Sequence, residues 1–236
     1  MEGDFEDDIC TLCSYFLIRT NTDATEFEMH RLVQFSTKSW LELRGETEKW
    51  KEKFIATMAE KFPVGQYENW TKCQKLFPHV EKALEYQPAN QNYLQRWASI
   101  LLNAAWYADE KGNYSIAEKM NRRAADAYEK ALGPEHPGTV VSMSNLAVVL
   151  RGQGKYEAAE EMHRQALELW EKILGPEHLN TVISMNNLAL VLDNQGKYEA
   201  AEEMHWQVLE LRKKILGPEH PDTLTSMSNL AVVLDD

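Results

Sequence analysis

The chain has 236 residues with 25 basic and 37 acidic side chains, a net charge of −12 at neutral pH, and 44% of its residues are hydrophobic. This composition is typical of a soluble protein, and no run of lysines or arginines could neutralise a nucleic-acid backbone. No apolar run approaches the roughly 18 residues that a membrane helix requires and no basic-then-apolar leader is present, so we expect neither a membrane span nor a secretory signal.

The first 44 residues combine two apolar segments with a polar turn. Residues 9–18 predict a short helix, residues 19–27 include the polar run Thr-Asn-Thr-Asp-Ala-Thr, and Met29 opens a helix that extends to Leu43. A helix, a hairpin wing and a second helix are what remains of a winged helix. We therefore expect residues 1–44 to be a winged-helix remnant, and the acidic charge argues against DNA binding.

The chain has three cysteines, two of which form the pair Cys10-x-x-Cys13. This spacing suits a redox or zinc site, but a zinc site needs a second pair and the sequence has none. Cysteines three residues apart on an apolar helix are more often core residues, so we expect no metal site. So few cysteines are typical of a reducing compartment, and we expect a cytoplasmic location.

Residues 45–92 are predicted to form a helical connector. Apolar residues recur there at helical spacing in two stretches, which Pro63 and Gly65 separate, and Pro78 should kink or split the second. The first stretch contains Trp50, Phe54, Ile55, Met58 and Phe62, and the second contains Trp70, Cys73, Leu76, Val80 and Leu84.

Residues 93–236 repeat with a period of 42 residues. The run Gly-Lys-Tyr-Glu-Ala-Ala-Glu-Glu-Met-His begins at Gly154 and again at Gly196. A fixed spacing of this size is typical of a solenoid, in which each unit buries its apolar face only against its neighbours. The units are about residues 93–136, 137–178 and 179–220, followed by a half repeat at 221–236.

Each period carries two amphipathic helices. In the second unit, Met143, Leu146 and Leu150 share one helical face, and apolar residues continue at helical spacing from Tyr156. The recurring Leu-Gly-Pro-Glu-His predicts a helix stop, because Gly175 suits a left-handed position and proline cannot extend a helix. Three threonines that recur after this stop should cap or open the next helix: Thr139, Thr181 and Thr223. Three histidines that recur in it should structure the loop: His136, His178 and His220.

Ala147, Ala159 and Ala166 are 12 and then 7 residues apart. This spacing resembles that of tetratricopeptide repeats, in which small side chains let the two helices of a hairpin approach closely. The 42-residue period, with Asn-Leu-Ala and Leu-Gly-Pro-Glu-His-Pro-Asp-Thr, resembles the kinesin-light-chain subtype. The resemblance implies an all-α fold: an α-solenoid of tetratricopeptide-like helical hairpins, wound as a right-handed superhelix.

A second resemblance covers the residues before the repeats. The run Phe-Glu-Met-His-Arg-Leu-Val-Gln from Phe27 resembles the end of the nucleotide-binding module of fungal-type NLR-like proteins (STAND proteins with an NB-ARC or NACHT module) that carry kinesin-light-chain-like repeats. The run from Phe62 to Trp70 resembles the segment that joins winged helix and repeats in those proteins.

In that family a Met-His-Asp motif places its histidine near the phosphate of ADP, so the resemblance implies that His30 is a nucleotide sensor in an intact protein. Here Arg31 replaces the aspartate, and the alternative is a helix-start histidine without a ligand. No Gly-x-x-x-x-Gly-Lys-Ser/Thr stretch is present. We therefore expect no cofactor for this chain, and ADP or ATP only in an intact parent protein.

In tetratricopeptide arrays the first helix of each pair lines the concave surface. The resemblance implies a groove that is apolar in its middle and charged at one rim, and its candidate peptide-binding residues are Trp106, Val148, Arg151, Asn186 and Leu190. Asparagines recur in register beside them, resembling the ladder with which kinesin-light-chain repeats hold extended peptides: Asn103, Asn145, Asn187 and Asn229. An amide donates and accepts, so such a row can pair with successive peptide groups. The alternative is that each asparagine bonds to the adjacent helix and fixes the stacking.

The half repeat has a first helix but no second. Met227, Leu230, Ala231 and Leu234 would then present an uncovered apolar stripe. We expect residues 223–236 to fray or to pack against another copy of the chain.

These features favour a protein–protein interaction or sensor module that binds a protein or peptide ligand and, in an intact protein, regulates an attached nucleotide-binding switch. The alternative is a kinesin-light-chain-like cargo adaptor, which should carry a coiled-coil segment before the repeats. An enzyme would need a nucleophile with its base or a metal cluster, and we identify none. We expect protein or peptide partners, and neither nucleic acid nor a membrane.

Overall fold

The structure is a computed structural model that describes residues 5–21 and 26–235. It divides into two compact units, residues 1–53 and 54–236, and the boundary falls within α3 (Thr47–Lys61). Part of the polar turn expected at 19–27 lies outside the described residues, as does Asp236 at the end of the half repeat.

The first unit contains α1 (Phe5–Ser14), the antiparallel strands β1 (Ile18–Thr20) and β2 (Phe27–Met29), and α2 (Arg31–Leu43). Ile18 pairs with Met29 across the hairpin. The helix expected over residues 9–18 ends instead at Ser14, because Phe16 has a φ of 56° and Ile18 begins a strand. Helix, hairpin and helix follow in the expected order, and their assignment to a winged helix stays a prediction.

The cysteines of this unit do not form a core. Cys10 is exposed on α1 and Cys13 is half-buried, so the expectation that they pack inside is wrong. Among the described residues of this unit, α2 does not cover them, because it buries none of its side chains and its apolar residues Leu32, Phe35 and Leu43 are exposed.

The second unit begins with the helices of the expected connector. α3 ends before Pro63, and a 3-10 turn (Tyr67–Asn69) leads into α4 (Trp70–Ala83). Pro78 lies inside α4 and does not split it. Cys73 is fully buried in the core that these helices share with α5 (Gln91–Glu110), and this burial raises the pKa of its thiol.

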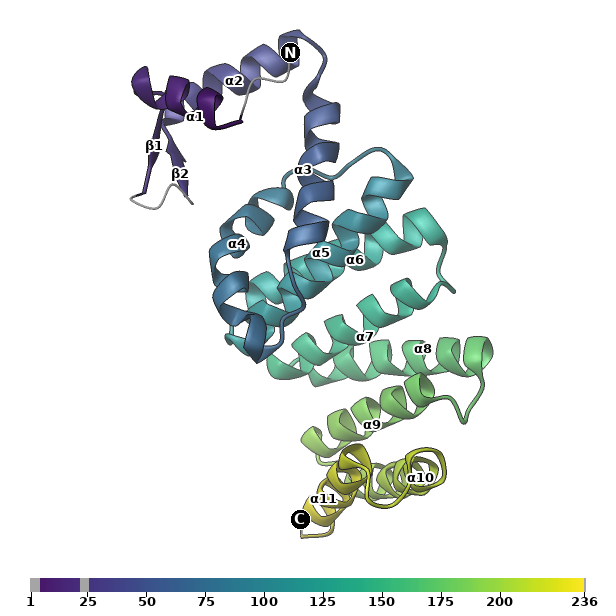
Figure 1. Ribbon diagram of the computed structural model, residues 1–236. Coiled ribbons are helices and arrows are strands. Elements are labelled where there is room, and N and C mark those ends of the chain that lie inside the picture. The colour runs from purple at the N-terminus through teal and green to yellow at the C-terminus, as the bar shows by residue number, and fades with distance from the viewer. Residues whose placement is uncertain (1–4, 22–25, 236) are drawn as a thin grey trace. The chain divides into compact units, whose positions relative to one another are not determined.

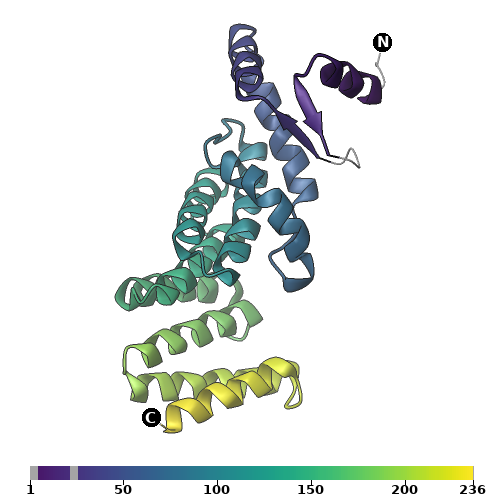
Figure 2. The ribbon, with the colours of Figure 1, turned by 90° about the vertical axis from the view of Figure 1, so that its left-hand side faces the viewer.

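Stacked helical hairpins make up the rest of the unit. α5 pairs with α6 (Tyr114–Leu132), α7 (Pro137–Gly152) with α8 (Tyr156–Leu174), and α9 (Leu179–Asn194) with α10 (Tyr198–Leu216), and α11 (Pro221–Asp235) follows alone. Each helix packs against the next one in the chain, so the hairpins stack in sequence order (Figures 1 and 2). Ala147, Ala159 and Ala166 are fully buried, and the all-α solenoid that the resemblance to tetratricopeptide repeats implied is confirmed.

A recurring loop separates the hairpins. Gly133, Gly175 and Gly217 have φ values of 90°, 85° and 93°, which only glycine adopts without strain. Nδ1 of the loop histidines accepts a hydrogen bond from the backbone N–H two residues on and so caps the next helix: His136, His178 and His220. The prediction that these histidines structure the loops is confirmed.

The loop threonines lie in the first turn of the next helix. The hydroxyl groups of Thr139, Thr181 and Thr223 each donate to the carbonyl of the loop glycine at 2.8 Å. Each threonine thereby ties the start of one hairpin to the end of the hairpin before it.

Ion pairs join the second helices of neighbouring pairs. Glu118 accepts hydrogen bonds from Arg122 on its own helix and from Lys155 at the start of the next second helix. Glu160 repeats this arrangement, and the hydrogen bond from Lys197 is the main cause that lowers the pKa of Glu160 to about 2 against the effect of burial. The repeat period therefore extends to charged contacts.

Replacing Thr181 by Val keeps the shape of the side chain but removes the donor to the Gly175 carbonyl. We expect T181V to lower the free energy of unfolding by about 1 kcal/mol, measured from urea titrations by circular dichroism. The control is T225V, because the exposed Thr225 hydroxyl bonds only to the Pro221 carbonyl of its own helix, and we expect a change below about 0.5 kcal/mol. Equal effects of the two substitutions would contradict the role of the buried contact.

Candidate functional site

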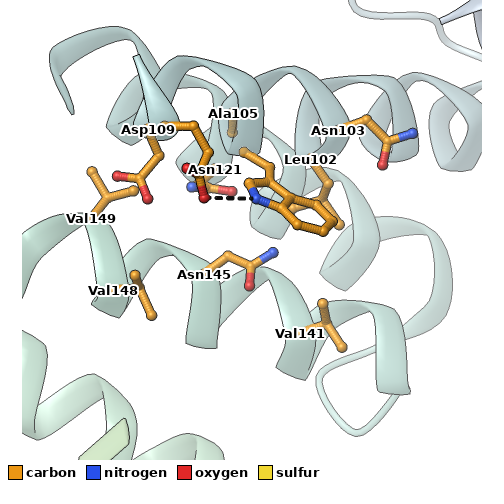
Figure 3. Close-up of a pocket in the computed structure, with 11 residues that line it drawn as sticks. Leu102, Asn103, Ala105, Asp109, Asn121, Val141, Asn145, Val148 and Val149 are labelled. Atoms are coloured by element: carbon orange, nitrogen blue, oxygen red, sulfur yellow. Dashed lines mark hydrogen bonds between the residues drawn. The ribbon is translucent and has the colours of Figure 1, made fainter. Parts of the chain in front are cut away.

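A hollow of about 520 Å³ lies between α5 and α7, with α6 contributing to its floor. α5 supplies Asn103 and Trp106, α7 supplies Asn145 and Val148, and α6 supplies Asn121 (Figure 3). The remaining lining residues are Leu102, Ala105, Asp109, Glu110, Val141 and Val149. Helices that come first in their pairs thus form the walls of the hollow.

Some of the predicted binding residues lie outside this hollow. Arg151 follows the lining residues of α7, and Asn186, Asn187 and Leu190 lie on α9. Asn229 is on α11, where its Nδ2 donates a hydrogen bond to Oδ1 of Asn186 at 3.2 Å. At Asn229 the amide therefore makes the packing contact between adjacent first helices that was weighed as the alternative to a peptide ladder.

His30 belongs to the first unit, where it caps α2. Its exposed side chain accepts a hydrogen bond through Nδ1 from the backbone N–H of Leu32 at 3.2 Å. This is the arrangement that the loop histidines make in the repeats, and it is the helix-start geometry weighed as the alternative to a nucleotide sensor. A contact between His30 and a nucleotide stays a prediction for an intact protein.

Asn121 is one of the lining residues that the sequence analysis did not name. Its side chain is 2% exposed, and its Oδ1 has no hydrogen-bond partner. The residues one and two periods on are His163 and His205, which are fully buried with both ring nitrogens unpartnered. The signal was present in the sequence, because an offset of 42 residues relates these three polar residues to one another.

The two ends of the hollow differ in polarity. Asp109 lies at one end, and Leu102 and Val141 lie at the other (Figure 3). Burial raises the pKa of Asp109, repulsion by Glu110 raises it further, and Arg151 acts in the opposite direction. The carboxyl group of Asp109 therefore lies at one end of the hollow, near Val148 and Val149, and the other end carries no carboxyl group among the labelled residues (Figure 3).

The Trp106 indole links this hollow to a second one. Its Nε1 donates a hydrogen bond to Oε1 of Glu110 at 3.3 Å, the dashed line in Figure 3. Trp106 and Glu110 also line a neighbouring hollow of about 440 Å³ against the loop from Gly65 to Trp70. Gly65 allows this loop to lie close to the backbone of α5, because a Cβ atom at residue 65 would lie 2.6 Å from the backbone nitrogen of Tyr107. Trp106 therefore borders both hollows.

Within residues 5–21 and 26–235, no three His, Cys, Asp or Glu side chains are grouped so that they could hold a metal ion. No helix in the same part of the chain has the length and apolarity needed to cross a membrane. The hollow offers amides, carboxylates and an indole, groups that bind a ligand through hydrogen bonds and buried apolar surface.

Comparison with protein families identifies the repeats. Residues 98–169, 144–214 and 194–236 each match the family described as tetratricopeptide repeat. An NLR-like protein of Hyaloscypha variabilis, described as a nucleotide-binding leucine-rich repeat-like protein, is 40% identical over 136 residues. That match covers 58% of this chain, and the chain spans only 14% of the length of that relative.

Solved structures show the same fold. Nearly identical TPR-like repeats ascribed to a kinesin light chain of Podosopora anserina superpose with a TM-score of 0.57 at 20% identity, covering 79% of this chain and 85% of that one. BtubC (BKLC) of P. vanneervenii gives a TM-score of 0.55 at 18% identity, covering 78% and 83%. At these identities the likeness establishes the arrangement of the helices.

Protonation of His163 should destabilise the fold. Burial, with a smaller effect of Arg151, lowers the pKa of His163 from 6.5 to about 4. The unfolded chain therefore binds the proton first, so this contribution to stability is complete above about pH 6.5 and decreases as the pH falls toward 4. At pH 5 we expect a loss of about 2 kcal/mol relative to pH 7.5, measured from urea midpoints.

The matched control is H163N, which installs the residue found at Asn121 in the preceding repeat and does not titrate. We expect this variant to lose less stability between pH 7.5 and pH 5 than the unchanged chain does. Equal losses would show that His163 does not carry the effect.

Proposed function

The chain belongs to the tetratricopeptide-repeat family, and on that premise we propose that it is a protein–protein interaction module that holds an extended peptide between α5 and α7. The observation that carries the proposal is the hollow itself, which has Asn103 on one wall and Asn145 on the other. Arrays of this kind are binding scaffolds rather than enzymes.

The two asparagines suit a peptide backbone. Each amide has donors and an acceptor, so it can pair with both the N–H and the C=O of an extended chain. Both side chains are half-buried, which leaves them accessible while their mobility is restricted. Leu102, Val141 and Val148 lie beside them in the hollow and would contact alternate ligand side chains.

The asparagines of the other repeats divide between two roles in this proposal. Asn229 contacts Asn186 and contributes to packing. Asn103 and Asn145 line the hollow and contribute to binding. Asn187 has the same register on α9 and extends the binding surface beyond the hollow.

We further propose that, in an intact protein, the repeats regulate an attached nucleotide-binding switch. The relative from Hyaloscypha variabilis supports this, because its description names a nucleotide-binding protein and the matched region is a small part of it. The first unit would then connect the repeats to that switch, and His30 would contact ADP or ATP there. In the first unit, three apolar residues of α2 are exposed and suit packing against another part of such a protein: Leu32, Phe35 and Leu43.

A kinesin-light-chain-like cargo adaptor is the second candidate, favoured by the structures ascribed to a kinesin light chain. The complete coding sequence separates the two candidates. A phosphate-binding loop before the present residue 1 supports the switch, and a coiled-coil segment in that place supports the adaptor. Both candidates imply a cytoplasmic location.

Self-association through α11 is a further part of the proposal. Leu224, Met227, Val232 and Leu234 are between 37% and 58% exposed on that helix, whereas Leu230 is 4% exposed because it packs inward. The expectation that Leu230 belongs to an uncovered stripe is therefore wrong. Light scattering that shows a strict monomer, with α11 fully protected in hydrogen exchange, would exclude this contact.

Peptide binding and packing can be separated with asparagine variants. From a displayed library of random extended peptides, binders are selected against the full chain and their affinities measured by fluorescence polarisation. We expect N103A and N145A each to weaken binding about fivefold, the loss of about 1 kcal/mol of hydrogen bonding, with unchanged melting. N229A should lower the melting temperature and change the affinity less than about twofold. Unchanged affinity with lower melting in N145A would assign that amide to packing.

A further inference from the structure

The charged residues that line the hollow all carry the same sign of charge. Asp109 and Glu110 are its only charged residues, and both are acidic. Among the residues that the structure describes, no basic side chain forms an ion pair with Asp109, although Arg151 is near enough to lower its pKa. An acidic side chain without a basic partner favours a ligand that carries positive charge.

Asn121 points to the same kind of ligand. It lies between Asp109 and Leu102 in the hollow (Figure 3), and its Oδ1 is buried and unpartnered. A buried acceptor without a donor destabilises the fold, so a ligand that supplies a donor to Asn121 would gain free energy from that contact. The amide oxygen accepts and cannot donate, so the ligand group must carry N–H or O–H.

The remaining lining suits a long aliphatic stem. Leu102 and Val141 form apolar surface away from Asp109, Val148 forms apolar surface nearer to it (Figure 3), and Trp106 presents an indole that is 42% exposed. Lysine and arginine combine a flexible apolar stem with a cationic tip that has several donors. The tip can also lie over the indole face, where a cation is attracted by the ring.

We propose that the hollow between α5 and α7 selects a lysine or arginine side chain of a bound peptide. The stem lies on Leu102 and Val148, and the cationic tip donates to Asp109, Glu110 and Asn121. This inference rests on the proposed peptide-binding function and names the side chain that the groove recognises. An acidic ligand side chain would be repelled, and an apolar one would leave Asn121 without a donor.

The test uses four small probes on the full chain: the N-acetyl methylamides of lysine, arginine, norleucine and glutamate. Norleucine matches the lysine stem and lacks its charge. Binding is followed through the Trp106 indole and Asn121 side-chain signals in nitrogen–proton NMR spectra. We expect lysine and arginine to shift both signals saturably, norleucine to bind at least tenfold more weakly, and glutamate not to bind. Raising the salt concentration should weaken the binding of the lysine probe and leave the binding of the norleucine probe unchanged.

Substitutions then locate the contact. D109N combined with E110Q should weaken the lysine probe at least tenfold and leave the norleucine probe unchanged. D193N is the matched control, because Asp193 holds the register of Asp109 two periods on and does not line the hollow, and it should bind lysine as the unchanged chain does. N121L removes the amide oxygen and keeps a side chain of similar shape. It should weaken the binding of the lysine probe, and its melting temperature should be unchanged or higher.

Three results would overturn the inference. They are equal binding of norleucine and lysine, unchanged lysine binding in the D109N and E110Q double variant, and no shift with any probe. The proposed function is tested separately with peptides selected from a random library. If their binding still requires Asn145, the proposed function stands and only the selectivity for a basic residue is rejected. A lysine probe that binds while the library yields no peptide would remove the proposed function.

Discussion

The close approach of helices across fully buried small residues is the constraint on which the rest of the second unit depends. Ala147, Ala159 and Ala166 have no exposed surface, and a larger side chain at any of them would push neighbouring helices apart. Each hairpin buries its apolar face only against the next hairpin. The first helices α5 and α7 therefore lie in neighbouring layers, and the groove between them is a consequence of this stacking.

The loops reinforce the same register. A glycine with a positive φ ends each hairpin, a histidine caps the next helix, and a threonine ties that helix back to the glycine carbonyl. Because these contacts recur in each loop, the repeats are related by a nearly constant geometry. That regularity makes the exceptions informative: Asn121 and its counterparts His163 and His205 are all buried, and Asn121 lines the hollow between α5 and α7.

A groove of this kind combines two chemistries. The amides of Asn103 and Asn145 suit a peptide backbone of any sequence, while the acidic end at Asp109 and the acceptor of Asn121 discriminate between ligand side chains. The negative charge of the whole chain adds long-range attraction for a basic partner. General affinity and specificity thus come from different residues of the same surface.

Sequence alone determined the elements whose causes are local or periodic. The hairpins, their loops and the buried alanines followed from spacing within one 42-residue unit, because helix stops, caps and apolar faces depend on residues a few positions apart. Only the tertiary structure decided which recurring residues face a hollow and which contact a neighbour. Asn145 lines the groove while Asn229 bonds to Asn186, and Leu230 is buried. These outcomes depend on side chains from other helices, which a local pattern does not place.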